Sequence, residues 1–433
     1  MKFYSTNNHQ YRVTLEEAVR KGLPDDKGLF MPGKMPLLPT EFFEQLSTMS
    51  LAEIGYNILR PYMQDEVPDN ILQGICEDAF SFPVPLVRVK DNIYTLELYH
   101  GPTLAFKDFG ARFMARLIGY FNISSTTKNT ILVATSGDTG SAVASGFYQV
   151  ENVEVVILYP RGKVSDLQER QMTTLGSNIH ALAIEGNFDD CQRLVKTAFV
   201  DKDLSAKFGL TSANSINLAR LLPQMIYYFY AYGQIINKDK PIVFSVPSGN
   251  YGNLTAGLIA NKMGLPVSRF IAAANANNIV PGYLQTGVFE PKPSIKTISN
   301  AMDVGDPSNF VRLQDILNHS WDEFKVKMQG YSYSDDQTRE TISKVYNNLG
   351  YLLDPHGAIG YKALNKYLKS HAATGIFLET AHPIKFKESI EPLLGHQLAI
   401  PEQLSPILNR QKISQPCSTD FHDFKVKLKN ILA

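Results

Sequence analysis

The chain has 433 residues, enough for two or three packed domains, and its 44% hydrophobic and 19% charged residues are ordinary for a globular protein. Its 42 basic and 42 acidic residues balance to a net charge of zero, so a nucleic-acid-binding protein is a poor fit. The opening residues lack the apolar core of a signal peptide, and no stretch approaches the roughly 18 apolar residues of a membrane span. We therefore expect a cytoplasmic protein without membrane contact.

Three cysteines, Cys76, Cys191 and Cys417, are widely spaced and lack the spacing of metal ligands. They are typical of the reduced thiols of a cytosolic protein. We predict no metal centre.

The pattern of the sequence changes near residue 91. Residues 1–90 predict a mixed segment of helix and loop. Beyond them, short apolar runs predict strands at 93–98, 130–134, 153–158, 181–184, 242–246 and 376–379. Helical periodicity predicts helices near 103–120, 139–150, 165–175, 188–200, 216–233 and 251–263. This alternation is typical of an α/β fold of open, mostly parallel twisted sheets flanked by helices.

We divide the chain into a mixed N-terminal segment (1–90), a small α/β domain (91–235) and a large C-terminal α/β domain (236–433). The segment 285–350 is read as an insertion or a lid. In parallel sheets, ligands bind beyond the carboxyl ends of the strands, and the motifs below fall there.

Lys107 lies between Phe106 and Phe109 at the start of an amphipathic segment. Aromatic neighbours keep water from an amine, which disfavours the ammonium form and leaves a nucleophile. A common use of such an amine is a Schiff base with pyridoxal phosphate. A lysine in a helix is more often a solvated charge, so this assignment depends on the other motifs of the sequence, which are described next.

The first strand-to-helix turn, residues 134–142, is rich in Gly, Ser and Thr. Such a turn presents free backbone N–H groups to an anion, aided by the helix dipole. The plainer interpretation is an N-cap made by Asp138 or Thr139. Asp138 would repel a phosphate, and its carboxylate is better suited to a hydroxyl or a cationic partner.

The second such turn, residues 245–254, again follows a strand and precedes a helix. Gly249 and Gly252 allow close approach of the backbone, and Ser248, Asn250 and Asn253 add donors. The turn matches neither dinucleotide-binding nor Walker patterns. It therefore favours a single phosphate on a small cofactor.

The third cluster runs from Asn214 to Arg220. If a helix begins near Ile216, Arg220 lies one turn inside it and can lean back toward Asn214 and Ser215. Arginine holds phosphate with two parallel hydrogen bonds. The alternative is a solvated helix arginine with an Asn or Ser cap.

Thr380 ends a predicted strand, where its hydroxyl is placed to hydrogen-bond a ring nitrogen. Three histidines near these motifs, His100, His356 and His382, receive no role and are expected to be structural.

Together these motifs give the chain a resemblance to a known family. It resembles the threonine synthases, pyridoxal-phosphate enzymes of fold type II, the tryptophan-synthase-β-like group. The matching segments are 101–108, 136–141, 214–217 with Arg220, 247–253 and 379–383, joined by 4–7 and 27–32 near the start. The likeness spans about the whole chain in the correct order, and it implies two domains of the fold type II kind.

The resemblance implies a role for each motif. Lys107 would bind the cofactor covalently, Asp138 would lie near its phenolic oxygen, and Thr380 would face its pyridine nitrogen. The cofactor phosphate would be held by Gly249, Asn250, Tyr251, Gly252 and Asn253. The substrate carboxylate would be bound by Ser136, Gly137 and Thr139, and the substrate phosphate by Asn214, Ser215 and Arg220.

The implied reaction converts O-phospho-L-homoserine and water to L-threonine and phosphate, the last step of threonine biosynthesis. Three alternatives remain open: a sibling phospho-lyase, a hydroxy-amino-acid dehydratase giving a 2-oxo acid, and a non-catalytic anion-binding relative. A dehydratase would have no use for the cluster at 214–220, and the presence of Lys107 argues against the non-catalytic relative. The expected partner is a small-molecule substrate.

Overall fold

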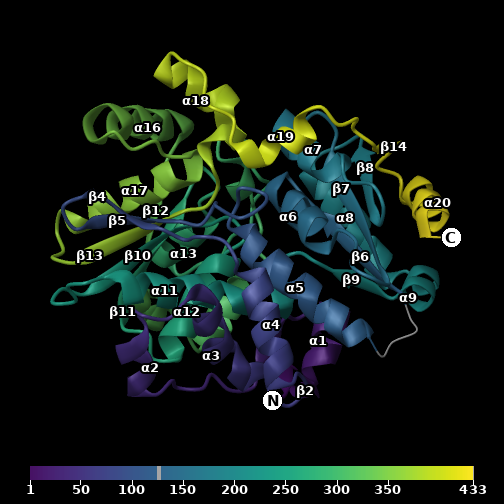
Figure 1. Ribbon diagram of the computed structural model, residues 1–433, viewed down its shortest axis with the longest axis horizontal. Coiled ribbons are helices and arrows are strands. Elements are labelled where there is room, and N and C mark those ends of the chain that lie inside the picture. Colours follow the sequence, from purple (N-terminus) through teal and green to yellow (C-terminus); the bar gives the residue numbers. More distant parts are fainter. Residues whose placement is uncertain (124–127, 433) are drawn as a thin grey trace.

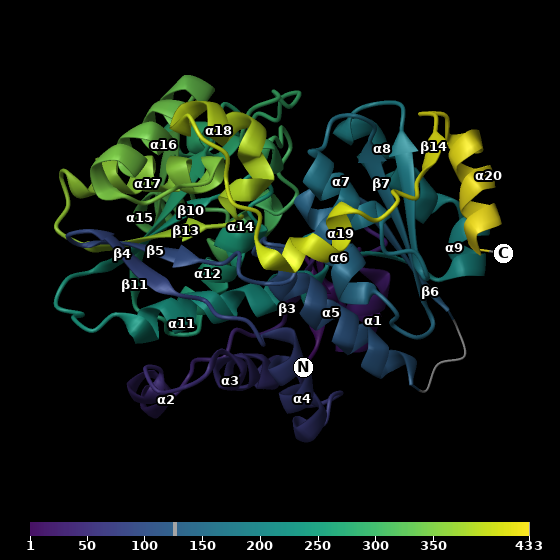
Figure 2. The ribbon, with the colours of Figure 1, turned by 45° about the horizontal axis from the view of Figure 1, so that its top comes forward.

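A computed structural model of the chain describes residues 1–123 and 128–432. Two parallel-rich sheets form the centres of two lobes that lie side by side (Figures 1 and 2). The N-terminal helices lie beneath both lobes, and the last part of the chain crosses from one lobe to the other (Figure 2). No helix among the described residues is both long and apolar enough to cross a lipid bilayer.

The larger sheet has six strands, and all of its pairs are parallel except β4 with β5. In spatial order they are β12 (Met328–Ser332), β11 (Val267–Ala274), β10 (Ile242–Pro247), β13 (Thr374–Glu379), β5 (Ile93–Glu97) and β4 (Leu86–Lys90). Helix α17 (Pro355–Leu368) packs on one face against β10, β11 and β13, and α16 (Asp335–Leu349) packs on α17.

The other helices of this lobe are α10 (Leu218–Leu221), α11 (Ile226–Gln234), α12 (Gly252–Lys262), α13 (Ile279–Thr286), α14 (Phe310–Ile316), α15 (Trp321–Lys327) and α18 (Lys387–Leu394). Short 3₁₀ turns lie at η1 (Leu222–Met225), η2 (Asn300–Met302) and η3 (Pro383–Phe386).

The smaller sheet has five strands, all parallel. Its order is β14 (Gln415–Cys417), β8 (Ile179–Ile184), β7 (Val153–Pro160), β6 (Asn129–Ala134) and β9 (Leu210–Ser212). The accompanying helices are α5 (Lys107–Asn122), α6 (Asp138–Phe147), α7 (Asp166–Thr173), α8 (Phe188–Val200), α9 (Lys202–Phe208), η4 (Glu402–Leu404), α19 (Ser405–Leu408) and α20 (Phe421–Leu432).

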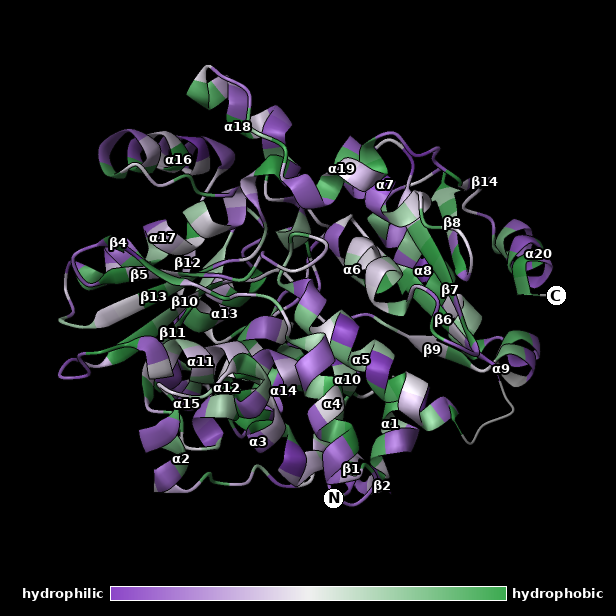
Figure 3. Ribbon diagram, viewed as in Figure 1, coloured by the Kyte–Doolittle hydropathy of each residue, from purple (hydrophilic) through white to green (hydrophobic). Residues whose placement is uncertain are grey.

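The α/β fold expected from the sequence is confirmed, and every predicted strand is present within a few residues. Strands β6 and β7 are apolar along most of their length, whereas α16 and α20 alternate between polar and apolar residues (Figure 3). The predicted helix at 216–233 is broken into α10, η1 and α11. Pro223 lies at this break and cannot donate a backbone hydrogen bond to a continuous helix.

The mixed N-terminal segment contains helices α1 (Leu15–Lys21), α2 (Thr40–Gln45), α3 (Leu51–Met63) and α4 (Asp69–Ala79). It also contains strands that the sequence did not predict: β1 (Phe3–Ser5), β2 (Asn8–Val13) and β3 (Phe30–Pro32), which form an antiparallel sheet. Two of these strands have three residues, and β2 is mostly exposed, so none shows the alternating apolar pattern of a half-buried strand.

Sheet membership does not follow contiguous stretches of sequence. Strand β5 lies in the predicted small domain but pairs with β13, and β14 lies in the predicted large domain but pairs with β8. The division into 1–90, 91–235 and 236–433 stays a prediction about domains. The segment 285–350 includes β12, an edge strand of the six-stranded sheet, so it is more than an insertion.

Candidate functional site

A cavity of about 1010 Å³ opens beyond the carboxyl ends of β6, β10 and β13. This is the edge at which parallel α/β sheets bind ligands. The predicted site residues that line it are Lys107, Ser136, Thr139, Asn214, Ser215, Arg220, Gly249, Asn250, Tyr251, Gly252, Asn253 and Thr380. The cavity lining does not include Gly137 and Asp138.

Lys107 is the first residue of α5 and faces this cavity. The loop before it is fixed by the segment after β13, because Phe106 N–H donates to the Thr380 carbonyl at 2.9 Å and His382 N–H to the Leu104 carbonyl at 3.0 Å. Burial lowers the pKa of Lys107 to about 8, and the nearby cations Arg220 and Lys385 act in the same direction. About a tenth of the amine is therefore neutral at pH 7, far more than for an ordinary lysine.

In the turn after β6, hydrogen bonds within the turn already engage two of its backbone N–H groups. The Thr135 hydroxyl accepts from the N–H groups of Gly137 and Gly140 at 2.9 and 2.8 Å. Gly137 is the N-cap of α6, with φ of 137°, and it has no side chain of its own; the Thr135 hydroxyl accepts from the helix amide of Gly140 in its place. The predicted cap by Asp138 or Thr139 is therefore wrong, because the backbone turns on a glycine whose conformation other residues avoid.

Asp138 begins α6 and is buried in an ion pair with Lys385, whose Nζ lies 2.7 Å from its Oδ1. Gln168 Nε2 donates to the same oxygen at 3.0 Å. Burial alone would raise the pKa of Asp138, but the charges of Lys385 and Lys107 hold it well below its usual range. The carboxylate stays ionised beside the cavity and leaves this turn unsuited to phosphate.

Lys385 is a site residue that the sequence did not single out. It lies in η3, is buried, and also donates to the Thr103 carbonyl at 2.9 Å. Its partner Asp138 belongs to the other lobe, so the pair joins the two lobes beside the cavity. The only sequence signal is a lysine inside the apolar run Pro383–Phe386, where an unpaired charge would be costly.

The turn between β10 and α12 has a different character. Tyr251, its N-cap, has φ of 59°, and the first turn of α12 holds no acidic residue. A Cβ at Gly249 would lie 2.6 Å from Met302 Cα, so only glycine fits between this turn and the segment around 302. The first N–H groups of a helix lack intrahelical acceptors, so this turn offers amides to an anion.

The polar side chains of this second turn mostly brace it. Asn253 accepts from the Ser248 hydroxyl at 2.6 Å and donates to the Pro247 carbonyl at 2.9 Å. Asn250 donates to the Ser215 hydroxyl at 2.7 Å, which connects this turn to the cluster at 214–220. The backbone amides, rather than these side chains, are left to hold a ligand.

Arg220 is a buried cation without an acidic partner. Its side chain donates to the Ala213 carbonyl, while its buried Nε has no hydrogen-bond partner. No ion pair within 4 Å includes it among residues 1–123 and 128–432. Burial lowers the pKa of Arg220 to about 10, which still leaves it charged at neutral pH. A buried charge of this kind calls for an anion.

The buried Arg312 shows the contrast. Its guanidinium donates to the carbonyls of Phe30, Ser215 and Ile216 and to the side chain of Asn309. These contacts tie α14 to the N-terminal segment through Phe30 and to the cluster at 214–220 through Ser215 and Ile216. Arg312 is structural, whereas Arg220 keeps a donor free.

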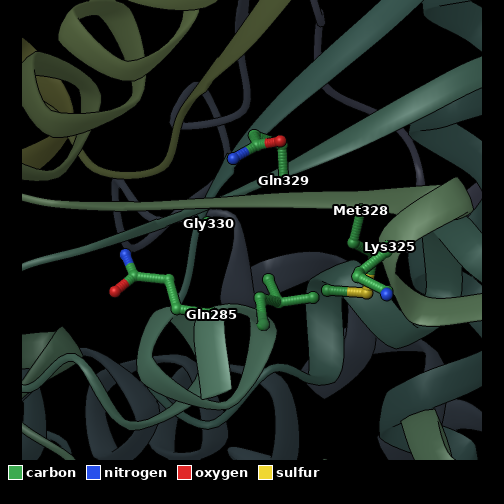
Figure 4. Close-up of a pocket in the computed structure, with 6 residues that line it drawn as sticks. Gln285, Lys325, Met328, Gln329 and Gly330 are labelled. Carbon is green, nitrogen blue, oxygen red and sulfur yellow. The ribbon is translucent and has the colours of Figure 1, made fainter. Parts of the chain in front are cut away.

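A second, smaller pocket of about 240 Å³ lies beside β12 (Figure 4). The polar ends of Gln285, Lys325 and Gln329 do not converge on it. Lys325 already lies 3.7 Å from the Trp321 ring centroid and pairs with Asp322 at 2.8 Å. The side chains that line this pocket therefore do not form a catalytic or ligand-binding cluster.

Three known protein families match successive parts of the chain. Residues 82–376 match the family described as pyridoxal-phosphate dependent enzyme, residues 2–80 match the threonine synthase N terminus, and residues 357–425 match the threonine synthase C-terminal family. Threonine synthase from Haemophilus influenzae is 47% identical over 430 residues, covering 99% of each chain.

Solved structures agree with this placement. The crystal structure of threonine synthase from Escherichia coli superposes with a TM-score of 0.94 at 44% identity, covering 99% of this chain and 100% of that one. A pyridoxal-phosphate-bound threonine synthase from Brucella melitensis gives a TM-score of 0.93 at 35% identity, covering 100% of this chain and 99% of that one. The chain therefore belongs to the threonine synthase family of pyridoxal-phosphate-dependent enzymes.

Proposed function

We propose that this protein converts O-phospho-L-homoserine and water to L-threonine and phosphate. The observation that carries the proposal is the arrangement of the cavity. A lysine of lowered pKa shares it with a glycine-containing helix start that holds no acidic residue and with a buried arginine that has no acidic partner within 4 Å among the described residues. A cofactor phosphate and a substrate phosphate then each have a separate site. The family match over the full length supports the same reaction.

The residues present fit pyridoxal phosphate. Lys107 supplies an amine whose lowered pKa makes its neutral form more accessible to bind the aldehyde. Gly249 to Asn253 supply amides for a phosphate, and the glycine at 249 allows the backbone to approach. Thr380 offers a hydroxyl rather than a carboxylate to the ring nitrogen, so a protonated ring is not enforced. Asp138, held by Lys385, is assigned to the phenolic oxygen.

The substrate is assigned to the opposite side of the cavity. Arg220, with Asn214 and Ser215, would bind the substrate phosphate, because its buried charge lines the cavity. Ser136 and Thr139, which line the cavity, would bind the substrate carboxylate at the N-terminus of α6, and Gly137, whose N–H donates to Thr135, would shape this turn. The Lys385 ammonium offsets much of the Asp138 charge, so this turn tolerates a singly charged carboxylate better than a doubly charged phosphate.

Lys107 would transfer protons at the carbon atoms of the substrate. When bound, the cofactor withdraws electrons from the substrate carbons attached to it. The amine of Lys107 takes the α proton and then a β proton, for which its lowered pKa suits it. The Arg220 guanidinium stabilises charge on the departing phosphate, and a proton is delivered to the γ carbon.

The three free, buried cysteines Cys76, Cys191 and Cys417 support the proposed cytoplasmic location, because reduced thiols are typical of cytosolic proteins. Cell fractionation with an antibody to the protein tests this location.

The reaction is tested by a product assay. Purified protein loaded with pyridoxal phosphate is given O-phospho-L-homoserine, and phosphate and the organic product are both quantified. Threonine and phosphate in equal amounts are expected. Phosphate with 2-oxobutanoate would instead indicate the sibling phospho-lyase, and no phosphate at all would mean that the substrate is different.

A further inference from the structure

The hydroxyl of Ser215 is surrounded by hydrogen-bond donors. Ser215 is half-buried and lines the cavity. Its Oγ accepts from Asn250 Nδ2 at 2.7 Å and from Asn309 Nδ2 at 3.3 Å. A serine hydroxyl has two lone pairs and one proton, so these two bonds use its whole accepting capacity. No group among residues 1–123 and 128–432 accepts the proton of this hydroxyl, which is therefore left for a ligand.

Arg312 determines which end of the Asn309 amide faces Ser215. Asn309 is fully buried, and the cavity lining does not include it. Its Oδ1 accepts from Arg312 Nη1 at 2.8 Å. Because a guanidinium can only donate, the oxygen of the amide must lie toward Arg312 and its NH₂ group toward Ser215. The same NH₂ group also donates to the Asn250 carbonyl at 3.0 Å.

The side-chain amide of Asn250 is oriented in the same way. Its Oδ1 accepts from the backbone N–H of Ser308 at 2.6 Å, and a backbone N–H cannot accept in return. The NH₂ group of Asn250 therefore faces Ser215. Two amides, each held at its oxygen by a group that can only donate, thus converge on one hydroxyl oxygen.

The start of this series is firmly held. Arg312 is fully buried, and its guanidinium donates to the backbone carbonyls of Phe30 at 2.9 Å and Ile216 at 2.7 Å. It also donates to the Ser215 carbonyl at 3.2 Å, so it contacts the same residue whose hydroxyl it orients through Asn309. Carbonyls can only accept, so the direction of hydrogen bonding runs from Arg312 through Asn309 to Ser215 and cannot reverse.

We propose that Asn309 is a positioning residue for the substrate phosphate, an inference that rests on the proposed function. Together with Asn250, it leaves the Ser215 hydroxyl free only to donate, and so directs its proton to a phosphate oxygen in the cavity. The oxygens of an ionised phosphate are strong acceptors, which makes a phosphate ester the matching ligand. Asn309 acts through Ser215 and does not touch the substrate.

A double-mutant cycle tests whether Asn309 acts through Ser215. The initial rate of phosphate release from O-phospho-L-homoserine gives kcat/KM for holoenzyme of the wild type, the two single variants and the double variant. We expect Ser215→Ala to lower kcat/KM by about 10- to 100-fold, mainly through KM, as for one lost hydrogen bond to a charged group. Asn309→Ala should lower it by about tenfold when Ser215 is present and by less than about twofold in Ser215→Ala.

Asn261, near the C-terminal end of α12, provides a matched control. Its Nδ2 donates to the carbonyls of Leu265 and Val267 at 2.8 and 3.1 Å, and its Oδ1 accepts from the Lys327 ammonium at 2.9 Å. Like Asn309, it bonds a cation at its oxygen and two acceptors at its nitrogen, but the cavity lining does not include it. Asn261→Ala should leave kcat/KM within about twofold of the wild-type value.

Two results would overturn the proposal. If Asn309→Ala lowers kcat/KM by the same factor with and without the Ser215 hydroxyl, Asn309 only supports the fold. If Ser215→Ala leaves kcat/KM unchanged, the hydroxyl does not meet the phosphate. Because phosphate release is measured, the cycle can be read whether the organic product is threonine or 2-oxobutanoate. Failure of this inference is therefore distinct from failure of the proposed function.

A measurement on the wild-type protein covers the case in which Asn309→Ala does not fold. A crystal structure of the holoenzyme soaked with inorganic phosphate should show a phosphate oxygen about 2.7 Å from Ser215 Oγ. The amides of Asn250 and Asn309 should still contact this Oγ. Phosphate bound in the cavity beyond the reach of Ser215 Oγ would contradict the proposal.

Discussion

The turns that open α6 and α12 are similar in sequence and different in chemistry. Both follow an inner strand of a sheet, and both are rich in glycine and small polar residues. In the first, the Thr135 hydroxyl occupies two of the amides, and Asp138 brings a negative charge to the first position of the helix. In the second, no acid lies in the first turn, and the side chains brace the loop from within.

This difference teaches that a helix N-terminus alone does not define an anion site. The residue at the first helical position, and the partner that reaches it from elsewhere in the chain, decide which ligand the turn accepts. Here Lys385 commits Asp138 to an ion pair, which leaves the turn at 247–253 as the better phosphate site. The predictions below test this contrast, starting with the largest effect.

Removal of Lys107, which faces the same cavity as both turns, should have the largest effect. We expect Lys107→Ala to reduce threonine formation by at least about 10³-fold, because the amine serves as both nucleophile and base. The absorbance band of lysine-bound cofactor should also disappear. Lys344→Ala, at an exposed position on α16, is the control. Normal turnover by Lys107→Ala would exclude the assignment.

Substitution of Lys385 tests whether its ion pair with Asp138 holds the first turn in place. Lys385→Met leaves Asp138 as a buried, unpaired carboxylate, which should lower the free energy of unfolding by about 3–5 kcal/mol. Urea unfolding of the apoprotein measures this change. The double substitution Lys385→Met with Asp138→Asn should recover much of the loss, since it removes the unpaired charge.

The matched control for this pair is Lys427→Met, which breaks a surface pair with Asp423 and should change stability little. Equal effects of Lys385→Met and Lys427→Met would show that the buried pair does not anchor the turn.

Arg220 tests the side of the cavity next to the second turn. Arg220→Ala should lower kcat/KM for O-phospho-L-homoserine by about 10²-fold, equivalent to about 3 kcal/mol for a lost charged hydrogen bond. Cofactor affinity should change far less. The surface substitution Arg161→Ala controls for charge. Unchanged kinetics in Arg220→Ala would remove this residue from the substrate site.

The pH dependence of cofactor capture gives the smallest effect. Because the pKa of Lys107 is lowered to about 8, the neutral amine fraction rises with pH and approaches its maximum above that value. The rate at which apoprotein takes up pyridoxal phosphate should therefore rise by about tenfold for each pH unit below about 8 and then level off. A rate that continues to rise toward pH ~10.5 would indicate an ordinary lysine.

The sequence predicted the positions of both turns because local pattern determines them: an apolar strand, then glycine, then a periodic helix. It also placed Lys107 and Thr380 at element ends that meet in space. It singled out Arg220 by its position after Asn214 and Ser215, but only the fold shows that Arg220 is buried without an acidic partner in the described part of the chain, whereas carbonyls satisfy the donors of Arg312.

Lys385 was missed for a related reason. It is defined by its ion pair with Asp138 in the other lobe, which burial rather than sequence spacing makes significant. A lysine followed by an apolar residue gives no local sign of such a partner. The short strands β1 and β3 were missed because three residues are too few for a periodic pattern.

The most direct test of the contrast between the two turns is a crystal structure of the holoenzyme. We predict electron density that is continuous from Lys107 Nζ to the cofactor, with the cofactor phosphate on the amides of residues 249–253. Asp138 should remain paired with Lys385. A cofactor phosphate bound instead at residues 136–139 would contradict the account.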